Sequence, residues 1–382
     1  MPKNKRPVPR KSAPVPPEDD ELLAAALADL ALTVAEQEDG DLAALRVSED
    51  ELHKLVRNAL RKKHDEVLYG AVERTRYADA GAYQLLRAAI EEAAATVLLR
   101  REGAPTMEIN AFMVPMFVHS QGGLDESVQF QDGAAFEALV ASFQQAGLES
   151  AAAKVVLISH AYDFGEVDRI TYSHLNDMLR DAAASMNERK LVATPAIERS
   201  LAGWDPRSFE AGDTAVELRF LLGFALKRSD DPFYQVPAEE GAADAYFDQR
   251  MARYVSWTEE AAPLVARCLA APAPSELHFL YQDLFYGAKQ QGMDELAMLQ
   301  LMSEVGAVLG AGQLAPEAVQ ATVGAAAEGD ELLLRLSLAG ADGVVLATVD
   351  KALDVAADLE AEIEDLRDAL ATLGITNLVQ RA

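Results

Sequence analysis

The chain of 382 residues contains a single cysteine, Cys268, so it can form neither an internal disulfide nor a cysteine-based metal cluster. This scarcity is typical of a reducing compartment, and we expect Cys268 to be a small buried side chain within the segment LVARCLAAP. No apolar run reaches the length of about 18 residues that a membrane span needs, and the N-terminus has no apolar signal region. The sequence therefore predicts a soluble cytoplasmic protein.

Basic residues are also scarce, with 34 Lys and Arg against 62 Asp and Glu and a formal net charge of −28. Nucleic acid and anionic membranes repel such a surface, so neither is an expected partner. The first 17 residues are an exception, because they combine five Lys and Arg with several prolines and predict a disordered basic arm. The arm is either a tether to RNA, lipid headgroups or an acidic protein, or a solubilising leader.

The familiar catalytic motifs are absent from the sequence. There is no glycine-rich phosphate loop ending in Gly-Lys-Ser/Thr, no GxGxxG after a strand, no GxSxG and no HExxH. Their absence makes an enzyme less expected without excluding one. No cofactor is predicted.

Residues 18–103 predict an N-terminal helical region. An alanine-rich helix runs from Glu18 to Gly40, and a second helix begins with a capping box formed by Ser48 and Glu51. A third predicted helix begins at residue 80. Opposite its apolar stripe, the second helix carries five basic residues, which form either a solvated face or a docking surface for an acidic partner: Lys54, Arg57, Arg61, Lys62 and Lys63.

Residues 104–235 predict a central α/β domain. The runs MEINAFMVPMFVHS and AKVVLISHAYDFG have the length and glycine boundaries of buried strands, and each is followed by a helical segment. This βαβα order favours a sheet with parallel neighbouring strands. Pro115 favours an edge or bulged position for the first strand, because proline cannot donate a hydrogen bond. The run at 213–235 fits a strand or a helix.

The remaining chain predicts a helical connector at 236–274, ending in the linker APAP, and a C-terminal ββαβ-like unit at 275–382. Two apolar runs around Ala341-Asp342-Gly343 indicate a hairpin. The amphipathic helix after it either packs on the hairpin or forms a dimer seam, with its apolar stripe at Leu359, Ile363, Leu366, Leu370 and Leu373. The expected fold class is mixed α/β and helix-rich.

Two histidines mark the candidate site. His119 and His160 each follow an apolar strand, and parallel strands would bring both to the carboxyl edge of the sheet. Asp163 follows His160, so an imidazole oriented by Asp163 could act as a general base. Together with His174 on the next helix, His160 and Asp163 could instead bind a divalent metal. The alternative is that these histidines cap strand ends or lie at the surface.

Several segments in order resemble an uncharacterised bacterial family, the domain of unknown function 2863. They are AYQLLRAAIEEAAATVLLRREG, INAFMVPMFVHS, DTAVELRFLLGFALKRSDDPFYQV, LHFLYQDLFYGA and LEAEIEDLRDALATLGITNLV, and they span most of residues 80 to 380. The resemblance implies a soluble bacterial protein and supplies no activity. Members of that family often carry a cysteine-pair tail, which this chain lacks.

Two functional hypotheses follow from the sequence. The first is a cytoplasmic interaction or regulatory protein that meets a protein partner, or a second copy of itself, through the basic helix, the arm or the C-terminal helix. The second is an enzyme, such as a metal-assisted hydrolase, with a site around His119, His160 and Asp163. The second hypothesis requires His119 and His160 to converge.

Overall fold

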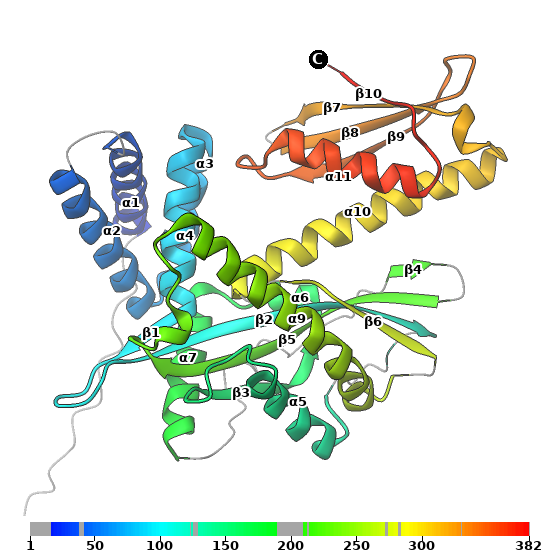
Figure 1. Cartoon of the computed structure of the whole chain (residues 1–382). Helices are drawn as coiled ribbons and strands as arrows, with labels where there is room; N and C mark the ends of the chain where they lie inside the picture. The colour runs from blue at the N-terminus through cyan, green and yellow to red at the C-terminus, as the bar shows by residue number, and fades with distance from the viewer. Residues whose placement is uncertain are drawn as a thin grey trace, which may run out of the picture. The chain divides into compact units, whose positions relative to one another are not determined.

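The computed structural model describes residues 17–37, 42–122, 124, 129–188, 209–211, 214–271, 274–281, 284–329 and 331–381. For residues 17, 18, 37, 42–44, 187, 188, 209–211, 214, 215 and 240 it describes the backbone alone. The chain divides into two compact units, Met1–Ile90 and Glu91–Ala382 (Figure 1). The predicted basic arm lies outside the described residues apart from residue 17.

The first unit consists of helices. Its elements are α1 (Pro17–Gln37), α2 (Leu42–Lys62), α3 (Asp65–Ala78) and the start of α4 (Ala80–Ala95). They bury apolar side chains such as Leu27, Leu52 and Leu68.

The predicted start of the second helix is wrong. Leu, Ala and Arg before Ser48 extend α2 back to Leu42, so Ser48 lies inside the helix and does not cap it. The helix ends where Lys63 adopts the left-handed conformation, with φ at 59°. The stretch that reads as one long helix is therefore two helices, α2 and α3.

The second unit contains a six-stranded sheet, sheet A. The strand order is β1-β2-β5-β3, with β4 paired to β5 and β6 paired to β2, and every pairing is antiparallel. The strands are β1 (Thr96–Leu99), β2 (Met107–Gln121), β3 (Lys154–Tyr162), β4 (Phe209–Ala211), β5 (Thr214–Arg228) and β6 (Ser275–Phe279).

The mixed α/β class with N-terminal helices is confirmed, but the expected parallel neighbours are wrong. β2 and β3 run in the same direction, yet β5 lies between them and is antiparallel to both. The run at 213–235 that fitted either a strand or a helix supplies this strand. It is long and apolar on both faces, so it can pair with two partners while both sides of the sheet are covered.

Pro115 does not place β2 at an edge. β2 pairs with β5 on one side without a register shift at Pro115, and with β1 and β6 in succession on the other side. Asn110 is the last residue paired to β1 and Met116 the first paired to β6. The Pro115 carbonyl accepts a hydrogen bond from the Leu280 amide at 2.9 Å. The Pro115 nitrogen points to the same side, in the interval between β1 and β6. No ladder hydrogen bond is therefore lost through the missing N–H of the proline.

Helices cover both faces of sheet A. One apolar cluster contains side chains of α7 (Tyr172–Glu188) and of the start of α10 (Phe285–Gly312). A second cluster on the other face contains side chains of α5 (Gly133–Gln145) and α9 (Glu240–Leu269). α9 lies in the segment expected to be a connector, but its apolar side packs on the sheet. β6, expected in the C-terminal unit, pairs instead with β2.

The interior near α9 contains Trp257 and the single cysteine of the chain. Trp257 is fully buried, and its indole N–H donates to Ser142 Oγ at 2.7 Å. Cys268 is buried as expected, and burial raises the pKa of its thiol to about 11. Both are therefore packing residues of the α9 layer.

A second sheet, sheet B, forms after α10. Its strand order is β10-β7-β8-β9, and only β10 and β7 are parallel. The elements are β7 (Gln320–Glu328), β8 (Glu331–Ala339), β9 (Val345–Leu353), α11 (Leu359–Thr372) and β10 (Leu378–Gln380). Two short 3-10 helices lie at Pro232–Tyr234 and Pro316–Ala318.

The predicted hairpin is confirmed, because β8 and β9 pair around a turn whose Gly343 has φ at 75°. The stripe of α11 packs on this sheet, since Ile363, Leu366 and Leu370 are buried in its core. β7 was not predicted, because its segment is dominated by alanine and glycine, which are poor strand formers. None of the helices in the described part of the chain has the length and apolar character needed to cross a bilayer.

We predict that Gly223→Ala destabilises the second unit. A Cβ at Gly223 would lie 2.7 Å from Leu157 Cδ2 and against the Phe112 ring, which packs there from the neighbouring strand. Such overpacking costs about 1–3 kcal/mol in the free energy of unfolding, to be measured by urea denaturation. Gly306→Ala on α10 is the control, because nothing lies within 4 Å of its added Cβ and helix propensity favours alanine. Equal stability of the two variants would contradict this packing.

Candidate functional site

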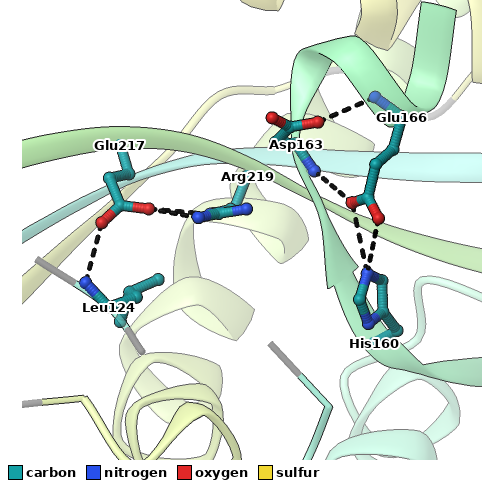
Figure 2. Close-up of polar contacts among 6 residues, drawn as sticks. All are labelled: Leu124, His160, Asp163, Glu166, Glu217 and Arg219. Atoms are coloured by element: carbon teal, nitrogen blue, oxygen red, sulfur yellow. Dashed lines mark hydrogen bonds and ion pairs between the residues drawn. The ribbon is translucent and has the colours of Figure 1, made fainter. Parts of the chain in front are cut away.

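Polar side chains lie buried where β3 ends, in an otherwise apolar region. His160 is 7% exposed, and Asp163 and Glu166 are each 1% exposed. All three come from a short stretch of chain that leaves the sheet and enters helix α6 (Phe164–Asp168). Figure 2 shows the group together with two charged side chains of β5. Buried ionisable groups are costly unless they are paired, so their contacts indicate what this site can do.

Asp163 and Glu166 fix the backbone at this turn. The Glu166 amide donates to Asp163 Oδ1 at 2.7 Å, and the Asp163 amide donates to Glu166 Oε2 at 2.9 Å. This reciprocal arrangement is a capping box at the start of α6. The sequence DFGE at 163–166 encodes it, and the result is a Glu166 carboxylate held in one orientation.

Glu166 also holds the imidazole of His160. His160 Nε2 lies 3.2 Å from both Glu166 oxygens (Figure 2). A carboxylate only accepts hydrogen bonds, so Nε2 is the protonated nitrogen in this contact. Nδ1 is buried and forms no hydrogen bond with the described residues. The histidine therefore has one nitrogen fixed by a carboxylate and a second that no described residue engages.

Tyr162 lies beside this pair. Its ring meets the His160 ring edge-on, with centroids 4.7 Å apart. Burial, and then the negative charge of Glu166, raises the pKa of the Tyr162 hydroxyl well above its ordinary value. Tyr162 therefore stays a neutral phenol at physiological pH.

The second charged pair belongs to β5. The Arg219 guanidinium donates to Glu217 Oε2, and Glu217 Oε1 accepts the Leu124 amide at 2.8 Å. Glu217 and Arg219 are 3% and 1% exposed. They lie two residues apart, so they share one face of the strand.

The strand register relates the two groups. Tyr162 pairs with Phe220, so Asp163 and Arg219 are the next residues along in the antiparallel direction. Figure 2 shows the two groups in one view. Glu217 and Arg219 were missed by sequence reasoning. The sequence pattern that could have identified them is a pair of opposite charges two residues apart within the apolar run AVELRFLL.

His119 does not join this group. It lies on β2 opposite Glu276 of β6, and its ring meets that of His278 at 5.0 Å between centroids. His119 pairs with Val216 of β5, four residues from Phe220. At about 3.3 Å per residue and 4.8 Å per strand, its backbone is about 13 Å along and about 10 Å across from the end of β3. The expected convergence of His119 with His160 is wrong, because β5 lies between their strands.

The metal hypothesis finds no support in the described residues. No three or more His, Cys, Asp or Glu side chains within them gather so as to hold a metal. His174, the third predicted ligand, lies on α7, where its amide donates to Thr171 Oγ1 at 3.3 Å. His160 and Asp163 are thus brought together with Glu166, and the structure shows no described contact of His174 with them.

Comparison with known proteins gives no match. No protein-family model, no curated protein and no solved structure is similar to the chain. The function of the chain is therefore inferred from the geometry and charge of its own residues.

We predict that the Glu217–Arg219 pair is a strong local determinant of stability. Glu217→Ala removes the buried carboxylate that accepts hydrogen bonds from the Arg219 guanidinium and the Leu124 amide, so it is expected to lower the free energy of unfolding by about 3–5 kcal/mol. Glu108→Ala is the matched control on the same sheet, because Glu108 faces Lys227 at 3.7 Å in a more exposed pair. The control should cost about 1 kcal/mol or less in urea denaturation. A Glu217 variant as stable as the control would refute the assignment.

Proposed function

We propose that the protein is an interaction protein whose helical unit binds an acidic surface of a protein partner. The binding surface is the basic face of the α2 region, defined by Lys54, Arg57, Arg61, Lys62 and Lys63. The observation that carries the proposal is the exposure of all five side chains in a chain with a net charge of −28. Opposite charges on two surfaces steer encounter and fix orientation.

The packing of α2 leaves the basic face exposed to solvent. Leu52, Val56, Ala59 and Leu60 are buried on the other side of the helix. Because i, i+3 and i+7 residues lie on one side of a helix, Lys54, Arg57 and Arg61 form a single stripe. Lys62 and Lys63 extend it at the C-terminal end, where positive charge also complements the helix dipole.

Charge is divided unequally between the two units. Residues 1–90 contain 14 Lys and Arg against 16 Asp and Glu, whereas residues 91–382 contain 20 against 46. The basic face thus belongs to the nearly neutral unit, where repulsion of an acidic partner is weakest. A long polyanion such as nucleic acid would also meet the acidic remainder of the chain. This favours a compact acidic protein surface as the partner.

The other predicted contact surfaces contribute less. The apolar stripe of α11 is buried on sheet B, so it does not form the alternative dimer seam. The basic arm stays a prediction, as do the cytoplasmic location and the resemblance to the domain of unknown function 2863. The resemblance adds no activity to the proposal.

The test uses a charge reversal on α2. The triple variant Lys54→Glu, Arg57→Glu and Arg61→Glu should bind a fluorescein-labelled polyglutamate peptide about tenfold or more weakly than the unaltered chain, by fluorescence anisotropy. Three exposed ion pairs at about 0.2–1 kcal/mol each account for a change of this size. Binding by the unaltered chain should weaken as salt rises, because these charges are exposed to solvent.

The matched control reverses the same number of charges elsewhere. Arg74, Arg100 and Arg101 are exposed and lie outside α2. If changing them to glutamate weakens peptide binding as much as the α2 change, net charge alone is responsible and the proposed face is refuted. Tighter binding of labelled RNA than of the peptide would point to nucleic acid instead.

The site at the end of β3 favours a second candidate function, an enzyme that uses His160 as a general base. The specific observation is the hydrogen bond between the Glu166 carboxylate and His160 Nε2. It leaves His160 Nδ1 as the nitrogen that can accept a proton. In this arrangement the carboxylate orients the imidazole and stabilises its protonated form. Asp163 acts through Glu166, because its carboxylate accepts the Glu166 amide and holds that backbone in place.

A panel of ester, phosphoester and amide substrates tests this candidate. Turnover should fall about 100-fold or more in His160→Asn, consistent with the contribution of a general base, and less in Glu166→Gln. His174→Asn is the control and should retain turnover. Activity that survives in His160→Asn would exclude the role.

A further inference from the structure

We propose that His119 and His278 form a two-histidine binding site for a divalent transition-metal ion. Neither the basic face of α2 nor the turn after β3 is part of this site. It lies on sheet A where β2 and β6 pair. The ligand class is an ion that prefers imidazole nitrogen, such as Cu²⁺, Ni²⁺ or Zn²⁺.

The strand register brings the two side chains together. His119 pairs with Glu276, and Phe117 pairs with His278, so the two histidines are diagonal neighbours across adjacent strands. Residues two apart on a strand lie on the same face, which places both imidazoles on one side of the sheet. The chain has six histidines, and these two meet although they are far apart in the sequence.

The ring geometry suits two ligands to one ion. The centroids are 5.0 Å apart and the rings are inclined at 71°, edge to face. Rotation about the side-chain bonds can turn one nitrogen of each ring toward a shared position without moving the strands. A paired sheet holds the two backbones in place, so little ordering remains to be achieved when an ion binds.

The ion can reach the pair from solvent. The side chain of His278 is 59% exposed, and His119 is half-buried.

The nearby carboxylate favours a cation at this position. Glu276 Oε2 lies 3.9 Å from His278 Nε2, and its side chain is 80% exposed. No group of three or more ligating side chains occurs in the described part of the chain, so the protein supplies the two imidazoles and water completes the coordination. Mg²⁺ and Ca²⁺, which take oxygen ligands, are not expected to bind.

Isothermal titration calorimetry of the full, untagged chain with NiCl₂ near neutral pH tests the proposal. We expect one ion per chain, proton release on binding, and loss of binding at a pH where both imidazoles are charged. His278→Ala removes an exposed side chain and should weaken binding about tenfold or more. His119→Asn should do the same, and MgCl₂ should give no binding heat.

His53→Ala is the matched control, because His53 lies on α2 in the other unit. It should leave Ni²⁺ binding unchanged. The proposal is overturned if the unaltered chain binds no Ni²⁺, if His278→Ala binds as tightly as the unaltered chain, or if His53→Ala causes an equal loss. Circular dichroism of each variant confirms that binding is compared between folded proteins.

Discussion

The antiparallel pairing of β5 with β2 and β3 is the constraint on which the second unit depends. Among the described strands, β5 alone pairs with both, and its pairing with β2 continues for 15 residues. One side of β5 faces the cluster that contains α7 side chains, and the other faces the cluster that contains α5 and α9 side chains. A strand in this position is mostly apolar on both faces, and the polar side chains away from its ends, Glu217 and Arg219, are buried in the core.

Glu217 and Arg219 lie on the strand that pairs with the end of β3, where the polar turn begins. Taking charges out of water costs several kcal/mol per ion, so apolar residues could have filled this position at least as stably. The cost is offset locally, because Glu217 bonds both Arg219 and the Leu124 amide. The turn after β3 also contains a shared acceptor, because the Glu166 carboxylate bonds both His160 and the Asp163 amide. Such shared acceptors leave the His160 imidazole few alternative hydrogen-bonded arrangements.

The sequence predicted local elements well and their pairing poorly. Glycine boundaries and apolar length identified β2 and β3, and the Ala341-Asp342-Gly343 turn identified the β8–β9 hairpin. The order of strands was not accessible, because a βαβα pattern fits both a direct parallel pair and a pair separated by a later strand. β5 comes from a segment whose periodicity fitted strand and helix alike, and the alanine-rich β7 has no strand signal. His160 and Asp163 are near neighbours in sequence and both bond to Glu166, whereas the contact between His119 and His278 depends on a long-range pairing of β2 with β6.

Residue-resolved amide hydrogen exchange tests the central place of β5 most directly. Elements that open only on global unfolding exchange slowest. The account predicts that the amides of Val216–Leu226 on β5 that bond to β2 or β3 are among the slowest in the second unit, and slower than those of the short strands β1 and β6. Exchange in β5 as fast as in β1 and β6 would contradict it.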